Sequence, residues 1–460
     1  MLYWIAGKPG NYPENPANPA MKPKSKSDPQ GSFLLPDLAA QLDPRHELCR
    51  LGRQIDWSGF EGAFGPLYSP EGRPALPIRR MVGLLILKQL LNLSDERVVE
   101  FWTLSGYAQW FCGESELQWG APCEASELVH FRHRIGPDGA ERILQSSIAV
   151  HAEKAREKEV VVDTTAQEKA ITFPTDTKLH AKIVRLAVKI AGKAQVPLRR
   201  SYVRTVPKLL QAQRGRRHPR TRQAALKAAR KLKTIAGRMV RELERKLPKG
   251  HRWREKLALC RRVLAQQRQD HDKIYSLHEP HVYCLAKGKE HKEYEFGAKA
   301  SVVVGKRHGV ILGALSLEKN AYDGHTLEPA LSQVERLTGY RPAVAIGDRG
   351  YRGRRHYGTT ELVTPQRAGL QATPYEKRRA RARFRRRAAI EPRIGHLKSD
   401  FRLGRNYLRG VAGDAINLIL AAAAANFRKW IREVLACLRI WIAFAHSLTA
   451  GRLLHAAQLQ

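Results

Sequence analysis

The strand pattern of this chain is interrupted, after its first strand, by a long helical segment. Residues 160–163 (Val-Val-Val-Asp) form a short β-branched run that is typical of a central strand. Strand patterns return only at residues 295–304 and 309–317, which are joined by a turn, and again at residues 343–347 and 361–364. Helical patterns cover residues 325–338, 389–399 and 415–438. This order predicts a mixed sheet flanked by helices, with an insertion after its first strand.

The interrupting segment, residues 179–272, is strongly basic. No Asp or Glu occurs between Lys178 and Arg241, so ion pairs within that stretch cannot neutralise its charge. A solvated helical face is the ordinary explanation of such charge, but the absence of acidic residues favours a surface that contacts phosphates. The whole chain has 81 Lys and Arg against 43 Asp and Glu, a net charge of +38. Such an excess predicts a polyanionic partner, above all nucleic acid.

Residues 32–158 are helical in pattern, and Ser94 and Ser126 are placed as N-caps of two of the helices. A helical domain that binds DNA and a packed bundle whose Arg residues are merely solvated explain this pattern equally well. Residues 1–31 are rich in Pro, Asn, Lys and Ser, a composition that predicts a disordered leader. Residues 432–460 are expected to form a C-terminal helical tail.

Two apolar stretches fall short of a membrane-spanning segment. Residues 81–91 contain Lys88, and residues 415–425 are too few and are followed by Arg428. The first ten residues lack the features of a signal peptide. The six cysteines show no spacing typical of a zinc site, which favours small buried side chains in a reducing compartment. We therefore expect a cytoplasmic protein that does not contact a membrane.

Two carboxylates, Asp163 and Asp348, stand at the ends of apolar strand patterns. A carboxylate at a strand end is held rigidly while the following loop opens to solvent, which suits metal binding or catalysis. Gly347 and Gly350 flank Asp348 and would let a bulky ligand approach the backbone. Each Asp alone is more typical of a helix cap or a loop, but two in similar contexts favour a shared site.

A site for two hard cations, about 3.5–4 Å apart, needs a third carboxylate, for which Glu391 is the candidate. In a helix, Glu391 would share one face with Arg387 and Lys398. A surface ladder of ion pairs produces the same spacing. Pro392 places Glu391 in the first turn of a helix, where an acidic residue also complements the helix dipole. The pattern alone therefore leaves both explanations open.

Taken together, these segments resemble a bacterial insertion-sequence transposase of the DDE type, within the insertion-sequence-five-like group. The resemblance runs from about residue 32 to residue 431. Its most specific segments are VVVDTTAQEKAITFPTD, NAYDGHTL, AIGDRGYRG and AAIEPRIGHLKSDFRLGRNYLRGVAGDAINLILAAAAANFR. The resemblance implies a ribonuclease-H-like core of α+β or α/β class, a mixed sheet with flanking helices. That core would comprise residues 159–178 and 273–431, with the basic helical insertion after the first strand and an N-terminal all-helical domain before it.

The same resemblance implies a site and a reaction. Asp163, Asp348 and Glu391 would form a catalytic triad that binds two divalent cations, Mg²⁺ or Mn²⁺. Water would cleave the phosphodiester at a transposon end, and the freed 3′-hydroxyl would attack target DNA. The implied partners are double-stranded DNA, as transposon ends and as target, and further copies of the chain on paired ends. The implied location is the bacterial cytoplasm, at the nucleoid when the protein is bound to DNA.

The family signature around the third carboxylate contains Tyr, Arg, Glu and Lys, and this chain has Phe384 in the Tyr position. A phenyl ring can stack on a base but cannot hydrogen-bond a phosphate. Arg387 and Lys398 keep the family spacing and would hold phosphates near the scissile bond. A basic run before the Glu391 helix is predicted to contact the DNA backbone, through Lys377, Arg378, Arg379, Arg381 and Arg383.

Two other residues lie in family-like segments, Asp176 and His325, and we interpret both as structural. Two other classes of function remain open at this stage. The chain could be a non-catalytic or degenerate DNA-binding protein, or a ribonuclease-H-like nuclease that cuts DNA without joining strands.

Overall fold

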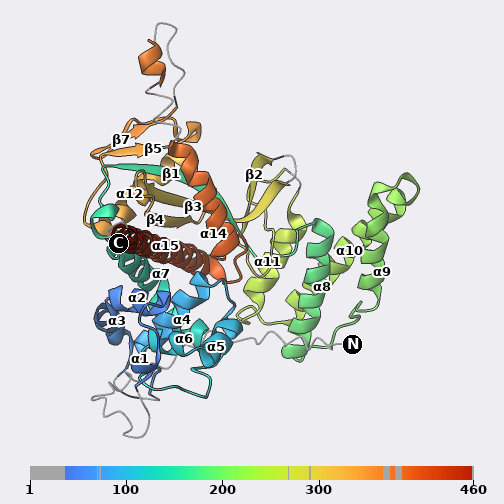
Figure 1. Ribbon diagram of the computed structural model, residues 1–460. Coiled ribbons are helices and arrows are strands. Elements are labelled where there is room, and N and C mark those ends of the chain that lie inside the picture. Colours follow the sequence, from blue (N-terminus) through green and yellow to red (C-terminus); the bar gives the residue numbers. More distant parts are fainter. Residues whose placement is uncertain are drawn as a thin grey trace.

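The computed structural model describes residues 37–69, 71, 74–267, 269–289, 292–365, 373–378 and 386–457 (Figure 1). The predicted leader, residues 1–31, therefore lies outside the described residues. The helices are α1 (Leu38–Gln41), α2 (Glu47–Gln54), α3 (Trp57–Phe64), α4 (Ile78–Leu90), α5 (Asp95–Leu104), α6 (Gly106–Phe111), α7 (Ala125–Ala149), α8 (Asp176–Lys193), α9 (Thr205–Ala212), α10 (Pro219–Lys246), α11 (Arg254–Ala265), α12 (Asp323–Thr338), α14 (Ile390–Asp400) and α15 (Gly410–Ala457).

A mixed sheet forms the centre of the molecule, as the sequence predicts. Its strands are β1 (Glu159–Glu168), β2 (Tyr283–Lys289), β3 (Lys292–Gly305), β4 (Ile311–Leu317), β5 (Val344–Ile346), β6 (His356–Tyr357) and β7 (Thr360–Val363). They lie in the order β2-β3-β1-β5-β7-β6, and β4 also pairs with β3. β1 pairs antiparallel with β3 but parallel with β5, and β5 is parallel to β7. β2 and β6 are the two strands that the sequence patterns did not predict.

The first strand is longer than its apolar run. β1 continues past Asp163 to Glu168, and this second half pairs with β3 as far as the register of Glu168 with Gly297. Asp163 therefore lies inside a strand, and the expectation that it ends one is wrong. The parallel pairing with β5, by contrast, stops at the register of Val161 with Ile346. Asp163 thus follows the end of the parallel pair, although β1 itself goes on.

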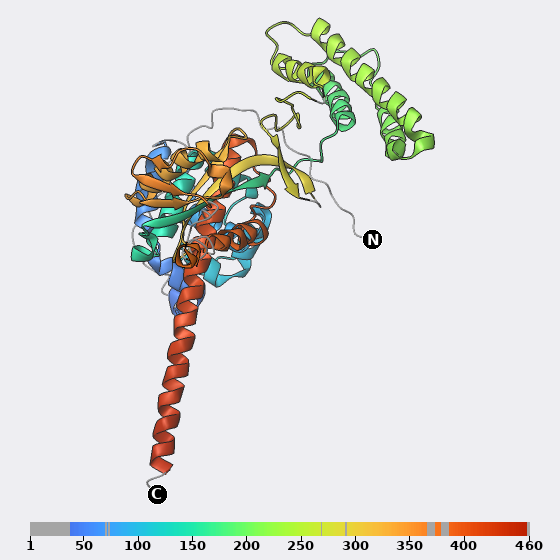
Figure 2. The ribbon, with the colours of Figure 1, turned by 90° about the horizontal axis from the view of Figure 1, so that it is seen from above.

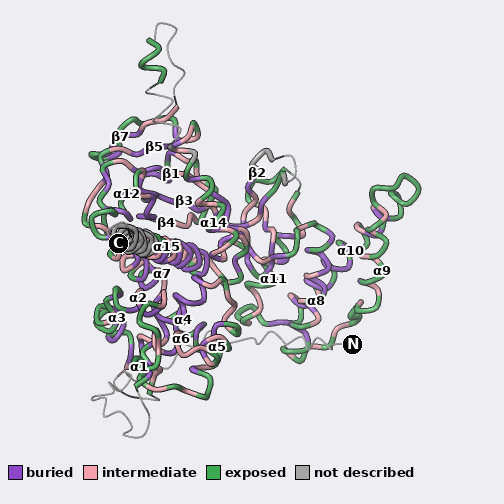
Figure 3. The backbone as a smooth tube through the Cα atoms, viewed as in Figure 1, coloured by how far each residue is buried: buried purple, intermediate pink, exposed green. Residues whose placement is uncertain are grey.

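The long apolar helix α15 joins the N-terminal helices to the sheet. It packs against α7 and α4 on one side and against β4 on the other. One continuous hydrophobic core includes Leu84 of α4, Phe131 of α7, Val303 of β3 and Leu420 of α15. Figure 3 shows the buried residues running through these helices and the sheet. The N-terminal region is helical as predicted, and its helices share their core with the sheet.

The basic insertion is helical, as expected, and has a core of its own. α8, α9, α10 and α11 pack around a separate cluster of buried side chains that includes Ile183, Leu232 and Leu243. Figure 2 shows these helices standing apart from the sheet and α15. The insertion begins at α8, three residues before the predicted start at residue 179. Leu179 itself is a buried member of this core.

The two predicted helix caps have different outcomes. Ser94 is the N-cap of α5, because its hydroxyl accepts a hydrogen bond from the backbone N–H of Arg97 at 3.2 Å. Ser126 is not a cap. α7 begins at Ala125 with Glu124 in the N-cap position, so Ser126 lies inside the first turn.

The helix predicted at residues 415–438 and the helical tail expected at residues 432–460 form one helix, α15, which runs from Gly410 to Ala457. By length and composition, its segment Gly410–Ala436 could cross a membrane, but 72% of the most apolar window is buried within the protein. Burial of this kind is also found in the core helices of soluble proteins. The expectation of no membrane contact stays a prediction.

Of the cysteines whose surroundings are described, Cys49, Cys112 and Cys260 are buried and free, while Cys123 and Cys284 are half-buried and free.

Candidate active site

Asp163 and Asp348 both follow the parallel pair that β1 forms with β5. β1 and β5 pair in parallel, with Val160 opposite Ala345 and Val161 opposite Ile346. Asp163 and Asp348 each lie two residues beyond the last pair of this register, Val161 with Ile346. Both side chains are half-buried. The two carboxylates predicted from the sequence therefore follow the pairing of two neighbouring strands, and their shared site stays a prediction.

Each of these carboxylates is oriented by the backbone that follows it. Asp163 Oδ1 accepts a hydrogen bond from the N–H of Thr164 at 2.8 Å. Asp348 Oδ1 accepts one from the N–H of Gly350 at 2.8 Å, where the chain makes a short 3₁₀ turn. Hydrogen bonds from backbone N–H groups hold a carboxylate in one orientation.

A third aspartate at this site, Asp323, was missed by the sequence analysis. It is the first residue of α12, and its Oδ1 accepts a hydrogen bond from the hydroxyl of Thr164 at 2.9 Å. The ammonium of Lys299, on β3, lies 2.7 Å from the same oxygen. A Cβ atom on Gly350 would stand 2.6 Å from Asp323 Oδ2 and 2.9 Å from Asp348 Oδ1. Asp323 and Asp348 therefore approach the same point above the glycine backbone.

The two glycines beside Asp348 make room for protein groups. A Cβ atom on Gly347 would stand 2.9 Å from the ring of Tyr351, and one on Gly350 would meet the carboxylates of Asp323 and Asp348. The expectation that these glycines admit a bulky ligand to the backbone is not supported by this geometry. Their physical role is to let a buried ring and two carboxylates pack against the chain.

Tyr351 is a buried side chain close to the aspartates. Its side chain is fully buried, and its hydroxyl has no hydrogen-bond partner among the described residues. Burial raises the pKa of Tyr351 well above its usual value, and the negative charges of Asp323 and Asp163 raise it further. The phenol is therefore neutral at any physiological pH.

Glu391 lies on a different element from the aspartates. It is exposed in the first turn of α14, a helix that packs against β1 and α15. Arg387 belongs to a preceding 3₁₀ turn, Arg386–Ala389, so the predicted helical face that would carry Arg387, Glu391 and Lys398 is not continuous. Within the described part of the chain, no group of three His, Cys, Asp or Glu side chains is placed to hold a metal ion. Asp163 and Asp348 thus follow the pairing of two neighbouring strands, whereas Glu391 lies on α14.

The aspartates have the donor chemistry that Mg²⁺ and Mn²⁺ require, since carboxylate oxygens are their preferred ligands. The residues present fit a hard divalent cation in kind. Lys299 offsets the charge of Asp323.

The predicted DNA-contacting residues are described only in part. Arg387 is half-buried, and its Nε has no hydrogen-bond partner among the described residues. Lys398 lies 3.9 Å from a carboxylate oxygen of Glu295 on β3. Lys377 and Arg378 are fully exposed on a short helical segment, residues 374–378. The remaining four predicted contacts lie outside the described residues: Arg379, Arg381, Arg383 and Phe384.

Asp176 and His325 are exposed in the first turns of α8 and α12, in keeping with structural roles.

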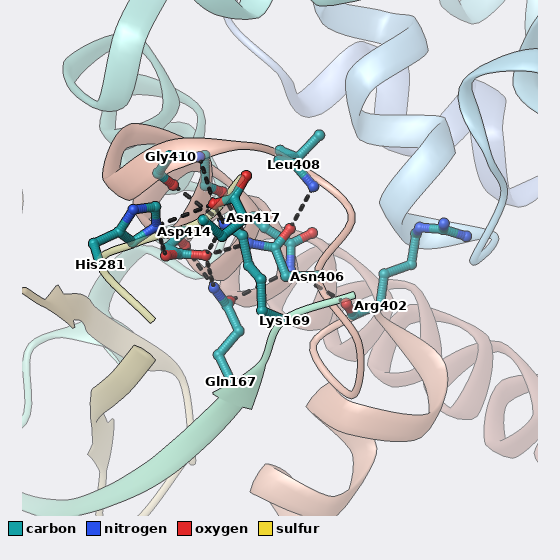
Figure 4. A network of polar contacts seen from close by, with 11 residues as sticks. Gln167, Lys169, His281, Arg402, Asn406, Leu408, Gly410, Asp414 and Asn417 are labelled. Carbon is teal, nitrogen blue, oxygen red and sulfur yellow. Dashed lines mark hydrogen bonds and ion pairs between the residues drawn. The ribbon is translucent and has the colours of Figure 1, made fainter. Parts of the chain in front are cut away.

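Beyond Asp163, the end of β1 is fixed by a buried polar network (Figure 4). Lys169 lies 2.6 Å from Asp414 at the start of α15 and 3.3 Å from Glu279 before β2. His281 lies 3.1 Å from Glu279 and 3.5 Å from Asp414. Gln167 donates a hydrogen bond to the carbonyl oxygen of Asp414 at 3.0 Å. These contacts tie the strand to α15 and to the segment by which the chain returns from the insertion.

Charge within this network shifts two pKa values. Hydrogen bonds to Asp414 and Glu279 raise the pKa of His281 to about 9, against the effect of burial. Burial alone would raise the pKa of Glu279, but the hydrogen bond from His281 and the charge of Lys169 lower it to about 2. The network therefore contains paired charges at neutral pH.

Comparison with known proteins gives two family matches. Residues 36–134 match a family described as a transposase domain (DUF772), and residues 267–427 match one described as the transposase DDE domain. The second match contains Asp323, Asp348 and Glu391 but not Asp163, which precedes the insertion. β1 is nevertheless joined to the matched segment by its pairing with β3 and β5. A DDE domain implies a ribonuclease-H-like fold, in accord with the mixed sheet.

A protein of Rhizobium meliloti, described as an uncharacterized protein, ORF8 in the nfe locus, is 42% identical to this chain over 208 residues. The match covers the whole of that protein and 44% of this chain. No solved structure matches the chain.

Proposed function

Because the chain belongs to the proteins that carry a transposase DDE domain, we propose that it is a transposase of the insertion-sequence-five-like group. It cleaves the DNA ends of an insertion sequence and joins them to target DNA. The observation that supports this proposal is that Asp163 and Asp348 both follow the parallel pair of β1 and β5, two residues beyond its last register, Val161 with Ile346. That pair joins two parts of the chain that the basic insertion separates in the sequence.

Three side chains have the proposed catalytic roles. Asp163 and Asp348, together with Glu391 supplied by α14, would hold two Mg²⁺ or Mn²⁺ ions. Such ions, when bound, make water a better nucleophile and stabilise negative charge on a leaving oxygen. The N–H groups of Thr164 and Gly350 keep the two aspartates oriented. Lys299 neutralises Asp323.

The DNA phosphates would be held by cationic side chains around this site. Arg387 and Lys398 flank Glu391 in the sequence, and the basic run that begins at Lys377 precedes it. The insertion supplies a second cationic surface, because no acidic residue occurs between Lys178 and Arg241. We further propose that the protein acts in the bacterial cytoplasm, as more than one copy on paired DNA ends.

The test is a cleavage and joining assay with the purified protein. Its substrate is duplex DNA carrying the inverted repeats that flank the gene, incubated with Mg²⁺, with Mn²⁺ or with EDTA. We expect cleavage only with a metal ion, followed by joining of the cut ends to a target plasmid. Asp163→Ala, Asp348→Ala and Glu391→Ala should each abolish cleavage while DNA binding, measured by gel shift, survives.

Asp176→Ala is the matched control, since Asp176 is an exposed carboxylate in the first turn of α8. It should leave cleavage unchanged. Full cleavage by any one of Asp163→Ala, Asp348→Ala and Glu391→Ala would refute the assigned triad. Cleavage without joining would instead identify a nuclease.

A second candidate function is supported by one observation. Glu391 is exposed and joins no group of three metal-binding side chains in the described part of the chain. This arrangement favours a degenerate protein that binds DNA without cutting it. Gel shifts with the inverted repeats, combined with a complete lack of metal-dependent cleavage, would support this alternative.

A further inference from the structure

A cavity of about 320 Å³ lies between α14, α15 and the start of β4, outside the cluster of aspartates. Its lining is predominantly cationic. The polar lining residues are Arg393, His396, Arg428, Lys429, Arg432 and Glu433. Phe401 and Ile311 contribute apolar surface. Neither the predicted site nor the predicted DNA contacts include any of these side chains.

Most of the cations around the cavity already have a carboxylate partner. Arg428 lies 3.3 Å from Glu47, and His396 lies 2.8 Å from Asp400. Lys429 lies 2.5 Å from Glu433, whose other oxygen is 2.9 Å from Lys154. Glu433, the acidic side chain among the described lining residues, thus forms ion pairs with two lysines, which offset its negative charge.

Arg393 and Arg432 differ from these residues, because neither forms an ion pair among the described residues. Arg393 is half-buried on α14, and burial lowers the pKa of its guanidinium, although the charge of Glu433 opposes this shift. A partly desolvated guanidinium without a carboxylate is costly unless an anion compensates it. Arg432 is exposed one turn along α15 from Arg428 and adds a second cation to the same cavity.

The turn between β3 and β4 fixes the position of the Arg393 guanidinium. Gly309, in this turn, has a φ of +68°, and a Cβ atom there would overlap the guanidinium nitrogens of Arg393. The guanidinium therefore lies directly against the glycine backbone, in space that only a glycine leaves open. A planar guanidinium held in one orientation suits a phosphate group, which accepts two parallel hydrogen bonds.

We infer that this cavity binds a phosphate group of the DNA strand on which the protein acts, through Arg393 and Arg432. The inference rests on the proposed DNA substrate and deepens it by naming a contact outside the aspartate cluster. Arg393 follows Glu391 by two residues on α14. A phosphate bound here would hold the helix that carries the third carboxylate against the DNA.

The test measures DNA affinity as a function of salt, in the full chain and without any divalent metal ion. Each phosphate contact that is lost lowers the slope of log affinity against log salt by about 1. We expect this decrease for Arg393→Gln and for Arg432→Gln. Arg97→Gln is the matched control, because Arg97 is exposed on α5 and paired with Glu100 at 2.7 Å. It should leave the slope unchanged.

Circular dichroism and thermal stabilisation by inorganic phosphate complete the test. Arg432 is exposed, so Arg432→Gln should fold even if the half-buried Arg393 is needed for stability, and circular dichroism verifies this. Wild-type slopes in both variants would overturn the inference. Thermal stabilisation by inorganic phosphate that both variants lose, with an unchanged DNA slope, would also overturn it, because the cavity would then take a small free anion. Since no cleavage is involved, failure of the proposed catalysis leaves this test intact.

Discussion

The carboxylates of Asp323 and Asp348 converge on Gly350, where a Cβ atom would lie 2.6 Å from one and 2.9 Å from the other. Asp323 comes from the start of α12, and Asp348 follows β5. The two carboxylates can come this close to the backbone only because Gly350 has no Cβ atom. The position of Asp348, and with it the proposed metal site, therefore depends on the size of a neighbouring residue.

Gly350→Ala is expected to displace one or both carboxylates. A misplacement of about 1 Å at a catalytic group can lower the rate about 100-fold, so we expect a loss of end cleavage of that order. DNA affinity, measured by gel shift, should be unchanged. Gly192→Ala on α8 is the control, because a Cβ atom there would meet nothing within 4 Å. Normal cleavage by Gly350→Ala would show that the two carboxylates do not need this close approach.

Asp323→Asn tests the ion pair with Lys299. The substitution keeps the shape of the side chain but leaves an ammonium that is only 12% exposed without its carboxylate. We expect a lower melting temperature and about tenfold slower cleavage, with a higher Mg²⁺ concentration needed for half-maximal rate. Replacing the cation as well, in Asp323→Asn with Lys299→Met, should restore both the melting temperature and the metal dependence, because the unpaired ammonium is then absent. If metal dependence never changes, Asp323 has only a structural role.

The sequence predicted the parts of this site that local pattern encodes. Asp348 follows an apolar strand and lies between two glycines, and both features are visible in ten residues of sequence. Asp323 has no such signal, because its role depends on contacts with Thr164 and Lys299 that only the folded chain creates. In its segment, NAYDGHTL, the sequence pattern drew attention to His325 and not to Asp323. A short Asp-Gly step at a helix start is an ordinary cap by pattern alone.

Long-range pairing also explains the errors in the strands. The second half of β1, from Thr164 to Glu168, has no apolar run, and it is a strand because β3 pairs with it. β2 likewise pairs with the first part of β3. The helical insertion was predicted correctly, since helix periodicity is local. The contact of α15 with both the N-terminal helices and the sheet could not be predicted, because an apolar helix has no sequence mark that identifies its partners.

Stability should depend on pH through His281. The ordinary histidine pKa is near 6.5, and the folded protein raises that of His281 to about 9. Folding thus favours the protonated form, so the stabilisation is complete below about pH 6.5 and is lost as pH rises through about 9. We expect the free energy of unfolding to fall between these values by on the order of 2 kcal/mol more in the wild type than in His281→Gln.

Urea unfolding at several pH values measures this difference. His325→Gln is the control, since His325 is exposed in the first turn of α12, away from the network. Identical pH dependence in the wild type and His281→Gln would mean that the contacts of His281 with Glu279 and Asp414 contribute nothing to stability.

The two hydrophobic cores predict that the chain unfolds in two parts. Leu420 belongs to the core shared by the N-terminal helices, the sheet and α15, whereas Leu243 belongs to the core of the insertion. Either Leu→Ala substitution should cost about 2–5 kcal/mol, but in different regions. Hydrogen exchange followed by mass spectrometry should show faster exchange in α7, β3 and β4 for Leu420→Ala, and in α8 and α10 for Leu243→Ala.

The exchange experiment tests whether the N-terminal helices and the sheet share one core, because α15 contacts α7 on one side and β4 on the other. A cavity at Leu420 weakens both contacts at once, so the N-terminal helices and the sheet should lose protection together while the insertion keeps its own. Faster exchange in β4 with α7 unchanged would mean that the N-terminal helices fold as an independent domain. In that case a fragment ending before β1 should be stable alone, whereas a continuous core predicts that such a fragment, deprived of α15, exposes Phe131 and Leu84 and aggregates.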